Sequence, residues 1–100
     1  MYFKKVIILV FVLVSSLLSD IKGPLEKIYE KKYENLNHFK AMYVAIDFDN
    51  GGWVYGYAYN HINEDEAEEA ARKSCIRQKR KSDINGYCKL YATGDRVLGL

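Results

Sequence analysis

AMYVAIDF (residues 41–48), DNGG (49–52) and WVYGYAY (53–59) follow one another in the middle of the chain and together decide the fold. Bulky apolar side chains recur at every second position of the first segment, and aromatic side chains do so in the third. This alternation is typical of β-strands, because successive side chains point to opposite faces of a sheet. The Asp-Asn-Gly-Gly segment between them is a turn signal. The sequence therefore predicts a β-hairpin.

A helix is predicted next, from Glu64 to about Lys81. Asn63 and Glu66 form an Asn-x-x-Glu capping arrangement at its start. Acidic residues fill the first turn and basic residues fill the last, as the helix dipole favours. The inward stripe consists of small residues: Ala67, Ala70, Ala71, Ser74 and Cys75. This helix is therefore expected to pack close to the sheet.

Three further elements complete the predicted fold. Residues 87–92 form a third strand after a turn at residues 83–86, and residues 96–98 form a short edge strand. Residues 24–40 have apolar side chains at helical spacing and are expected to form an N-terminal helix. We expect an α+β fold with a three- to four-stranded, mainly antiparallel sheet in the order β-β-α-β-β and one helix packed on one face. A right-handed crossover gives the strand order second, first, third, fourth.

The first nineteen residues have the pattern of a secretory signal peptide. Two lysines precede an unbroken apolar run at residues 6–14, and small residues follow it. The run is shorter than the roughly 20 apolar residues that span a membrane; an uncleaved signal anchor is the alternative. We expect a signal peptide at 1–19, a helical segment at 20–40 and the α+β domain at 41–100. The location is then periplasmic or secreted, with membrane contact only through the signal segment.

Cys75 and Cys88 are the only two cysteines of the chain. An even number of cysteines in a small exported domain indicates a disulfide. On the chain-entropy model this bond stabilises the fold by about 3 kcal/mol. A redox pair or a metal site is the alternative, but redox pairs usually have Cys-x-x-Cys spacing, and zinc needs more ligands than two cysteines and two scattered histidines offer. We expect no metal and no cofactor.

The disulfide also orients the predicted sheet. Cys75 lies on the inward stripe of its helix, so Cys88 must point toward that helix, and Leu90 and Ala92 with it. The same face is expected to carry the small residues of the second strand, Val54, Gly56 and Ala58, and the bulky residues of the first, Met42, Val44, Ile46 and Phe48.

The opposite face is then expected to carry seven aromatic side chains: Tyr43, Trp53, Tyr55, Tyr57, Tyr59, Tyr87 and Tyr91. Such a surface exceeds the apolar patch that a monomer normally exposes. In one interpretation the helix at 24–40 covers it, through Leu25, Ile28, Leu36 and Phe39. In the other it is a recognition surface, because Tyr and Trp combine a large rigid contact area with a polar tip that suits sugar rings or a protein partner.

Signals for catalysis or metal binding are weak. Asp47 begins a segment that resembles a calcium loop, but Gly51 and Ala58 stand where that loop requires side-chain oxygens. His38 and His61 have no partner at catalytic spacing. The chain also has no Gly-rich phosphate loop, Gly-x-Ser-x-Gly motif or His-Glu-x-x-His motif.

The net charge of +2 comes from Lys4 and Lys5 alone. From residue 20 onward, 13 basic residues balance 13 acidic ones. Bulk charge therefore gives no reason to expect a nucleic-acid partner.

Three segments resemble a small bacterial secreted domain of unknown function. They are GWVYGY (52–57), the alanine-rich helix that leads to Cys75, and CKLYA (88–92). That family carries a Trp-Gly-Tyr-type strand, an alanine-rich helix ending in Cys and a Cys-x-Leu-Tyr-Ala strand. The resemblance covers about residues 41–98, with Val54 at a position where the family often has glycine. It implies a periplasmic or secreted α+β module without catalytic activity.

We therefore expect a non-catalytic binding module that uses its Tyr/Trp-rich sheet face for a protein or a cell-wall glycan. The alternative is a small periplasmic enzyme or an enzyme inhibitor. An enzyme would need a concave pocket with convergent polar groups near Asp47, His61 or Lys89.

Overall fold

The computed structural model describes residues 20–36 and 39–100. The predicted signal peptide and His38 lie outside these ranges. Residues 20–28 are α-helical and continue directly into a short π-helix. The elements that follow one another are η1 (Tyr29–Tyr33), β1 (Phe39–Ile46), β2 (Trp53–His61), α2 (Glu64–Lys81), β3 (Lys89–Thr93) and β4 (Arg96–Val97).

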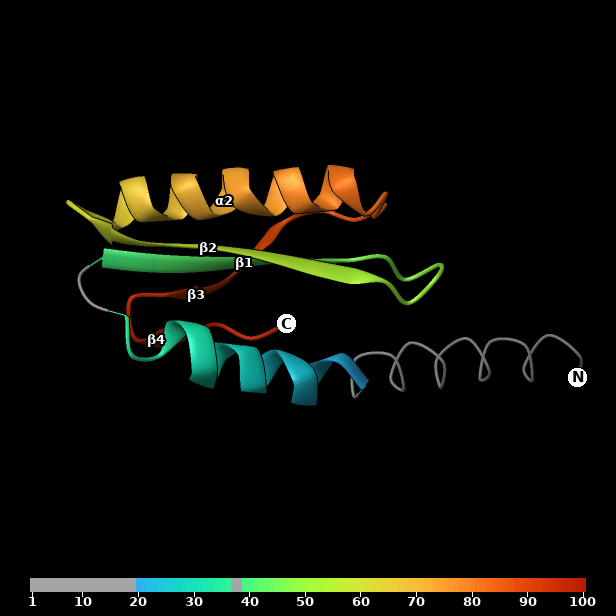
Figure 1. Ribbon diagram of the computed structural model, residues 1–100, viewed down its shortest axis with the longest axis horizontal. Coiled ribbons are helices and arrows are strands. Elements are labelled where there is room, and N and C mark those ends of the chain that lie inside the picture. The colour runs from blue at the N-terminus through green and yellow to red at the C-terminus, as the bar shows by residue number, and fades with distance from the viewer. Residues whose placement is uncertain (1–19, 37–38) are drawn as a thin grey trace, which may run out of the picture.

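The strands form one sheet in the order β2-β1-β3-β4, and all neighbours pair antiparallel. Helix α2 covers one face of this sheet, and the helical residues 20–33 cover the other (Figure 1). The predicted α+β fold and strand order are confirmed. Strands β2 and β3 run parallel on either side of β1, as a right-handed crossover through α2 requires.

Local signals place α2 where the sequence predicts it. The Asn63 side chain accepts a hydrogen bond from the Glu66 backbone N–H at 2.8 Å, which is the predicted N-cap. The small inward residues Ala67 and Ala71 are fully buried. A disulfide joins Cys75 of α2 to Cys88, whose Cα atoms lie 6.1 Å apart. The helix is thus fixed on the sheet by close packing and one covalent bond.

The faces of β1 are the reverse of the prediction. Val44 pairs with Tyr55, and Tyr43 pairs with Gly56. Directly opposite residues of antiparallel strands share a face, so Val44 lies on the side of the aromatic residues and Tyr43 lies under α2. The prediction that the bulky side chains of β1 face α2 is wrong for Met42, Val44 and Ile46, which belong to the core on the other side. Their supposed neighbour Phe48 lies outside β1, in the turn, and is 54% exposed.

Strand β3 contains a bulge that the sequence did not reveal. Met42 pairs with Ala92 while its neighbour Tyr43 pairs with Leu90, so Tyr91 is an extra residue on β3. Leu90 faces α2, as predicted, and packs in the alanine cluster there. Beyond the bulge the alternation shifts, and Ala92 joins Tyr91 in the core on the opposite face. The prediction that Ala92 faces α2 is therefore wrong.

The N-terminal helix ends earlier than predicted, because the chain from Phe39 onward belongs to β1. Lys40 is 3% exposed, and its Nζ donates hydrogen bonds to the carbonyls of Tyr33 (3.3 Å) and Glu34 (2.9 Å). The same Nζ lies 3.0 Å from an Asp95 carboxylate oxygen. A cation at the last carbonyls of a helix satisfies groups that have no partner within the helix. Lys40 thus ties the end of the helix to the sheet.

Candidate functional site: the aromatic ladder of β2

Four aromatic side chains stand in a row on one face of β2. Alternate positions of a strand share a face, and neighbouring rings of this row are 6.3 Å apart between centroids. The planes of Tyr55 and Tyr57 differ by 16°, and those of Tyr57 and Tyr59 by 18°. We call these residues the ladder: Trp53, Tyr55, Tyr57 and Tyr59.

The other three aromatic residues of the predicted surface are not part of the ladder. Tyr43 lies on the α2 side of the sheet. Tyr87 precedes β3 and is 88% exposed, with Lys79 Nζ 5.8 Å from its ring centroid. Tyr91 shares the ladder's face but is buried, with its ring edge-on to Tyr29 at 6.3 Å. The structure thus brings the four aromatic residues of β2 together and separates the rest.

The N-terminal helix covers the ladder only in part. Ile28 and Leu36 pack on the same core as Trp53, Tyr55 and Tyr57. Phe39, the fourth residue expected to cover the aromatic face, lies on β1 and is 45% exposed. The three rings nearest the hairpin turn remain half-buried, and Tyr59 is 50% exposed. Part of each ladder ring therefore remains accessible.

Lys32 reaches the middle of the ladder from η1. Its Nζ donates a hydrogen bond to the Tyr55 hydroxyl at 3.1 Å and lies 5.8 Å from the centroid of the same ring. This hydrogen bond is the main reason that the pKa of Lys32 lies above its usual value. A positively charged side chain therefore contacts the ladder at Tyr55.

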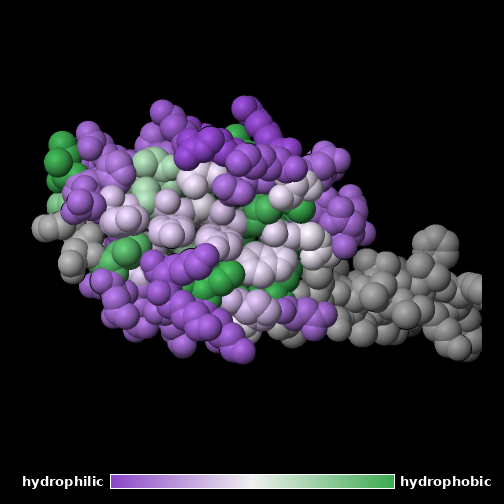
Figure 2. Space-filling view, in the orientation of Figure 1, coloured by the Kyte–Doolittle hydropathy of each residue, from purple (hydrophilic) through white to green (hydrophobic). Residues whose placement is uncertain are grey.

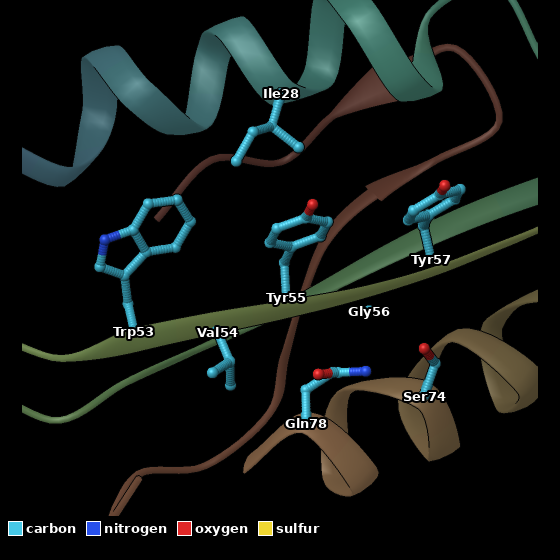
Figure 3. Close-up of a pocket in the computed structure, with 8 residues that line it drawn as sticks. All are labelled: Ile28, Trp53, Val54, Tyr55, Gly56, Tyr57, Ser74 and Gln78. Carbon is cyan, nitrogen blue, oxygen red and sulfur yellow. The ribbon is translucent and has the colours of Figure 1, made fainter. Parts of the chain in front are cut away.

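A groove of about 440 Å³ runs beside the ladder (Figure 3). Ile28 points into it from the N-terminal helix, and Ser74 and Gln78 approach from α2, on the opposite side of β2. Its remaining lining residues belong to β2: Trp53, Val54, Tyr55, Gly56 and Tyr57. None of these eight residues is charged. Figure 2 shows a pale band of weakly polar residues between two strongly hydrophilic borders on this side of the molecule.

Gly56 determines how closely α2 approaches the groove. A Cβ atom at this position would overlap the backbone of Ser74 and Cys75. Only glycine allows such a contact between a strand and a helix backbone. The sequence pattern predicts that Gly56 and Ser74 face each other, but it does not identify Ser74 and Gln78 as lining residues of a groove. Ser74 and Gln78 are four residues apart beside the small stripe of α2, and this spacing indicates that they share one side of the helix.

Asp47, His61 and Lys89, the polar residues that an enzyme would have to bring together in one pocket, do not converge. Asp47 is 4% exposed, and its carboxylate accepts backbone hydrogen bonds from Asp49 and Asn85, both at 3.0 Å. These bonds, the one from Asn85 first, hold the pKa of Asp47 below its usual value. His61 ends β2 at the opposite end of the hairpin, roughly 30 Å away at about 3.3 Å per residue. Asp47 therefore stabilises a turn.

A second groove, of about 350 Å³, lies near the hairpin turn. Lys89 is the one residue of the three that lines it. Apolar and aromatic side chains from residues 44–48, residues 87–91 and the C-terminal residues also line it, among them Phe48, Tyr87, Tyr91 and Leu100. Neither Asp47 nor His61 contributes to it.

Comparisons with protein-family models, curated proteins and solved structures give no significant match. Within residues 20–36 and 39–100, no helix is long and apolar enough to cross a membrane. In the same part of the chain, no three His, Cys, Asp or Glu side chains gather as a metal site would require.

Proposed function

We propose that this chain is an exported, non-catalytic binding protein whose ladder holds an uncharged glycan. The observation that carries the proposal is the row of near-parallel, partly accessible rings beside a groove whose lining residues are uncharged. Lys32 adds a hydrogen-bond donor at the Tyr55 hydroxyl. Tyr and Trp rings offer apolar faces together with hydroxyl and N–H groups. A sugar ring matches both, because its C–H face is apolar and its hydroxyls are polar.

Export is supported by the sequence pattern of residues 1–19 and by the disulfide. The chain has two cysteines, and both are used in the Cys75–Cys88 bond. Structural disulfides persist in oxidising compartments and are rare in the cytosol. We therefore place the protein in the periplasm or outside the cell.

A protein partner is the second candidate, and exposed apolar residues favour it. Phe39 pairs with His61 at the end of the hairpin away from the turn. Phe39 is 45% exposed, Tyr59 is 50% exposed and Ile62 is 77% exposed. Apolar side chains grouped at one end of an exposed aromatic row are a common feature of protein interfaces.

Pull-down with isolated cell-wall material and with envelope lysate tests both candidates. The variant Tyr57→Ala/Tyr59→Ala removes two rings from the ladder. We expect the loss of each ring to weaken the binding of cell-wall glycan about tenfold. Tyr87→Ala is the matched control, since Tyr87 is exposed but lies outside the ladder. We expect this control to bind like the wild type.

Equal glycan binding by the wild type and the ladder variant would refute the proposal. Loss of a specific envelope protein from the ladder-variant pull-down, without any glycan binding by the wild type, would favour the second candidate. The thermal unfolding temperature of both variants is measured as well. A wild-type unfolding temperature shows that a loss of binding is not caused by misfolding.

A further inference from the structure

Among the described residues, β2 is an edge strand and no other strand pairs with its outer side. Its residues 53–59 contain no proline and no charged side chain. Natural edge strands usually carry one of these to prevent pairing with another chain. The stretch ends at Asn60, where the backbone has φ 64° and the register with β1 shifts. Seven consecutive residues of β2 are thus open to pairing.

The hydrogen-bond register shows which backbone groups point outward. The Asp47 N–H donates to the Gly52 carbonyl at 2.8 Å, so positions 47 and 52 form a hydrogen-bonded pair. Bonded and non-bonded pairs alternate along antiparallel strands. Residues 54, 56 and 58 therefore bond to β1. The N–H and C=O groups of Trp53, Tyr55 and Tyr57 point toward the free edge.

Helix α2 presents a self-complementary flank above this edge. Ser74 and Gln78 lie on the flank, because they line the groove beside β2. Helical spacing of three and four residues extends it through Ala70 to Glu66 in one direction and to Lys81 in the other. Glu66 and Lys81 are both exposed. The flank is acidic at the Glu66 end and basic at the Lys81 end, where Arg77, three residues beyond Ser74, adds a second positive charge.

We propose that a second copy of this chain pairs antiparallel with β2 about a two-fold axis at Gly56. Gly56 lies under Ser74 and Cys75, so one axis passes through the middle of both the strand and the helix flank. Tyr55 of one copy then pairs with Tyr57 of the other, and both have outward backbone groups. Ser74 meets its own counterpart, and Glu66 of each copy faces Lys81 of the other. Such an isologous contact closes as a dimer.

The charge pattern favours a second copy over an unrelated extended peptide. An antiparallel copy brings opposite charges together at both ends of the interface. The chain beyond the signal segment carries balanced charge, so no bulk repulsion opposes the contact. The second copy fills the α2 side of the groove and leaves the ladder on the other face. The sheet then has eight strands, with two ladders side by side.

Sedimentation equilibrium of the exported protein, without any glycan, tests the dimer through a charge swap. We expect the wild type to reach twice the chain mass. Glu66→Lys and Lys81→Glu each place like charges at both ends of the interface and are expected to weaken association on the order of tenfold. The combined variant Glu66→Lys/Lys81→Glu restores opposite charges, and we expect it to associate like the wild type.

Arg80→Glu is the matched control, because it makes the same charge change in the same helical turn but lies about 100° around the helix from Lys81. We expect it to leave association unchanged. A monomeric wild type, or equal weakening by Arg80→Glu and Lys81→Glu, would overturn the dimer.

Hydrogen exchange locates the contact between the two copies. We expect the amides of Tyr55 and Tyr57 to gain protection as the protein concentration rises. A dimer that leaves these amides unprotected also contradicts the proposal. Because no glycan is present, none of these results depends on the proposed function.

Discussion

At the scale of single residues, Gly56 limits which side chain can stand between β2 and α2. A methyl group there would overlap the α2 backbone at Ser74 and Cys75, and the Cys75–Cys88 disulfide limits how far α2 can shift away. We expect Gly56→Ala to lower the free energy of unfolding by about 3 kcal/mol or more, which is the upper range for overpacking. Urea unfolding of the purified protein measures this loss.

Gly23 provides the control for the same substitution. It lies in the helical residues 20–28, and a Cβ atom at this position has no neighbour within 4 Å. Gly23→Ala is expected to stabilise the protein by up to about 1 kcal/mol, since alanine favours a helix over glycine. Equal stability of the two variants would contradict the close approach of α2 to β2.

Asp47 makes the stability depend on pH. The backbone N–H groups of Asn85, Asp49 and Asn50 lower the pKa of its carboxyl from the ordinary 3.8, so the folded state favours the carboxylate. This contribution is fully present above pH 3.8 and is lost as the pH falls through the lower folded-state pKa. We expect Asp47→Asn to be less stable than the wild type at neutral pH and to approach it in acid.

Urea midpoints measured from neutral pH into acid follow this difference. Asp49→Asn, at an exposed position two residues away, is the control and should keep the wild-type pH dependence. A constant gap between Asp47→Asn and the wild type throughout the acid range would show that the carboxylate does not provide this stability.

At the scale of elements, local signals predicted the hairpin and α2, whereas nonlocal pairing decided the faces. The Asn63 cap and the turn at 49–52 can be recognised from a few residues, and both occur in the structure. Both faces of β1 are apolar, so its alternation alone does not show which face meets α2. Only the pairing of Val44 with Tyr55 settles this. The bulge at Tyr91 depends on the partner strand and has no glycine to mark it.

The candidate site was predictable to the extent that it lies on one strand. Alternation within β2 was enough to place the four ladder residues together. The places of Tyr43, Tyr87 and Tyr91 depend on other elements: Tyr43 faces α2 instead, Tyr87 precedes β3, and Tyr91 lies on the predicted face but is buried under the N-terminal helix. The groove was not predictable, because Ile28 and Gln78 come from two helices on opposite sides of the sheet.

The disulfide links two elements that are otherwise held by small side chains. Cys75 and Cys88 are separated by 13 positions, and closing a loop of this length stabilises the fold by about 3 kcal/mol. We expect Cys75→Ala/Cys88→Ala to lose about this free energy of unfolding under oxidising conditions. With reductant present, the wild type should approach the variant. Two reactive thiols in the exported wild type would contradict the bond.

At the scale of the whole molecule, the two faces of the sheet serve different purposes. Alanine and glycine allow α2 to lie close to one face. The other face carries the bulky core, on which Ile21 and Leu25 of the N-terminal helix are buried. That helix leaves part of the ladder accessible. The aromatic row, the groove and the pairing edge are thus three features of one strand.

The ladder contains the single tryptophan of the chain, Trp53, so its fluorescence reports on the proposed binding surface directly. The decisive measurement is a titration of the exported protein with soluble cell-wall glycan fragments while Trp53 emission is followed. We expect a saturable change in emission, which Tyr87→Ala retains. Tyr57→Ala/Tyr59→Ala should lose this change, or should require about tenfold more glycan for each ring removed. Unchanged Trp53 emission at glycan concentrations where calorimetry detects binding would show that the glycan binds elsewhere and that the ladder is not its binding surface.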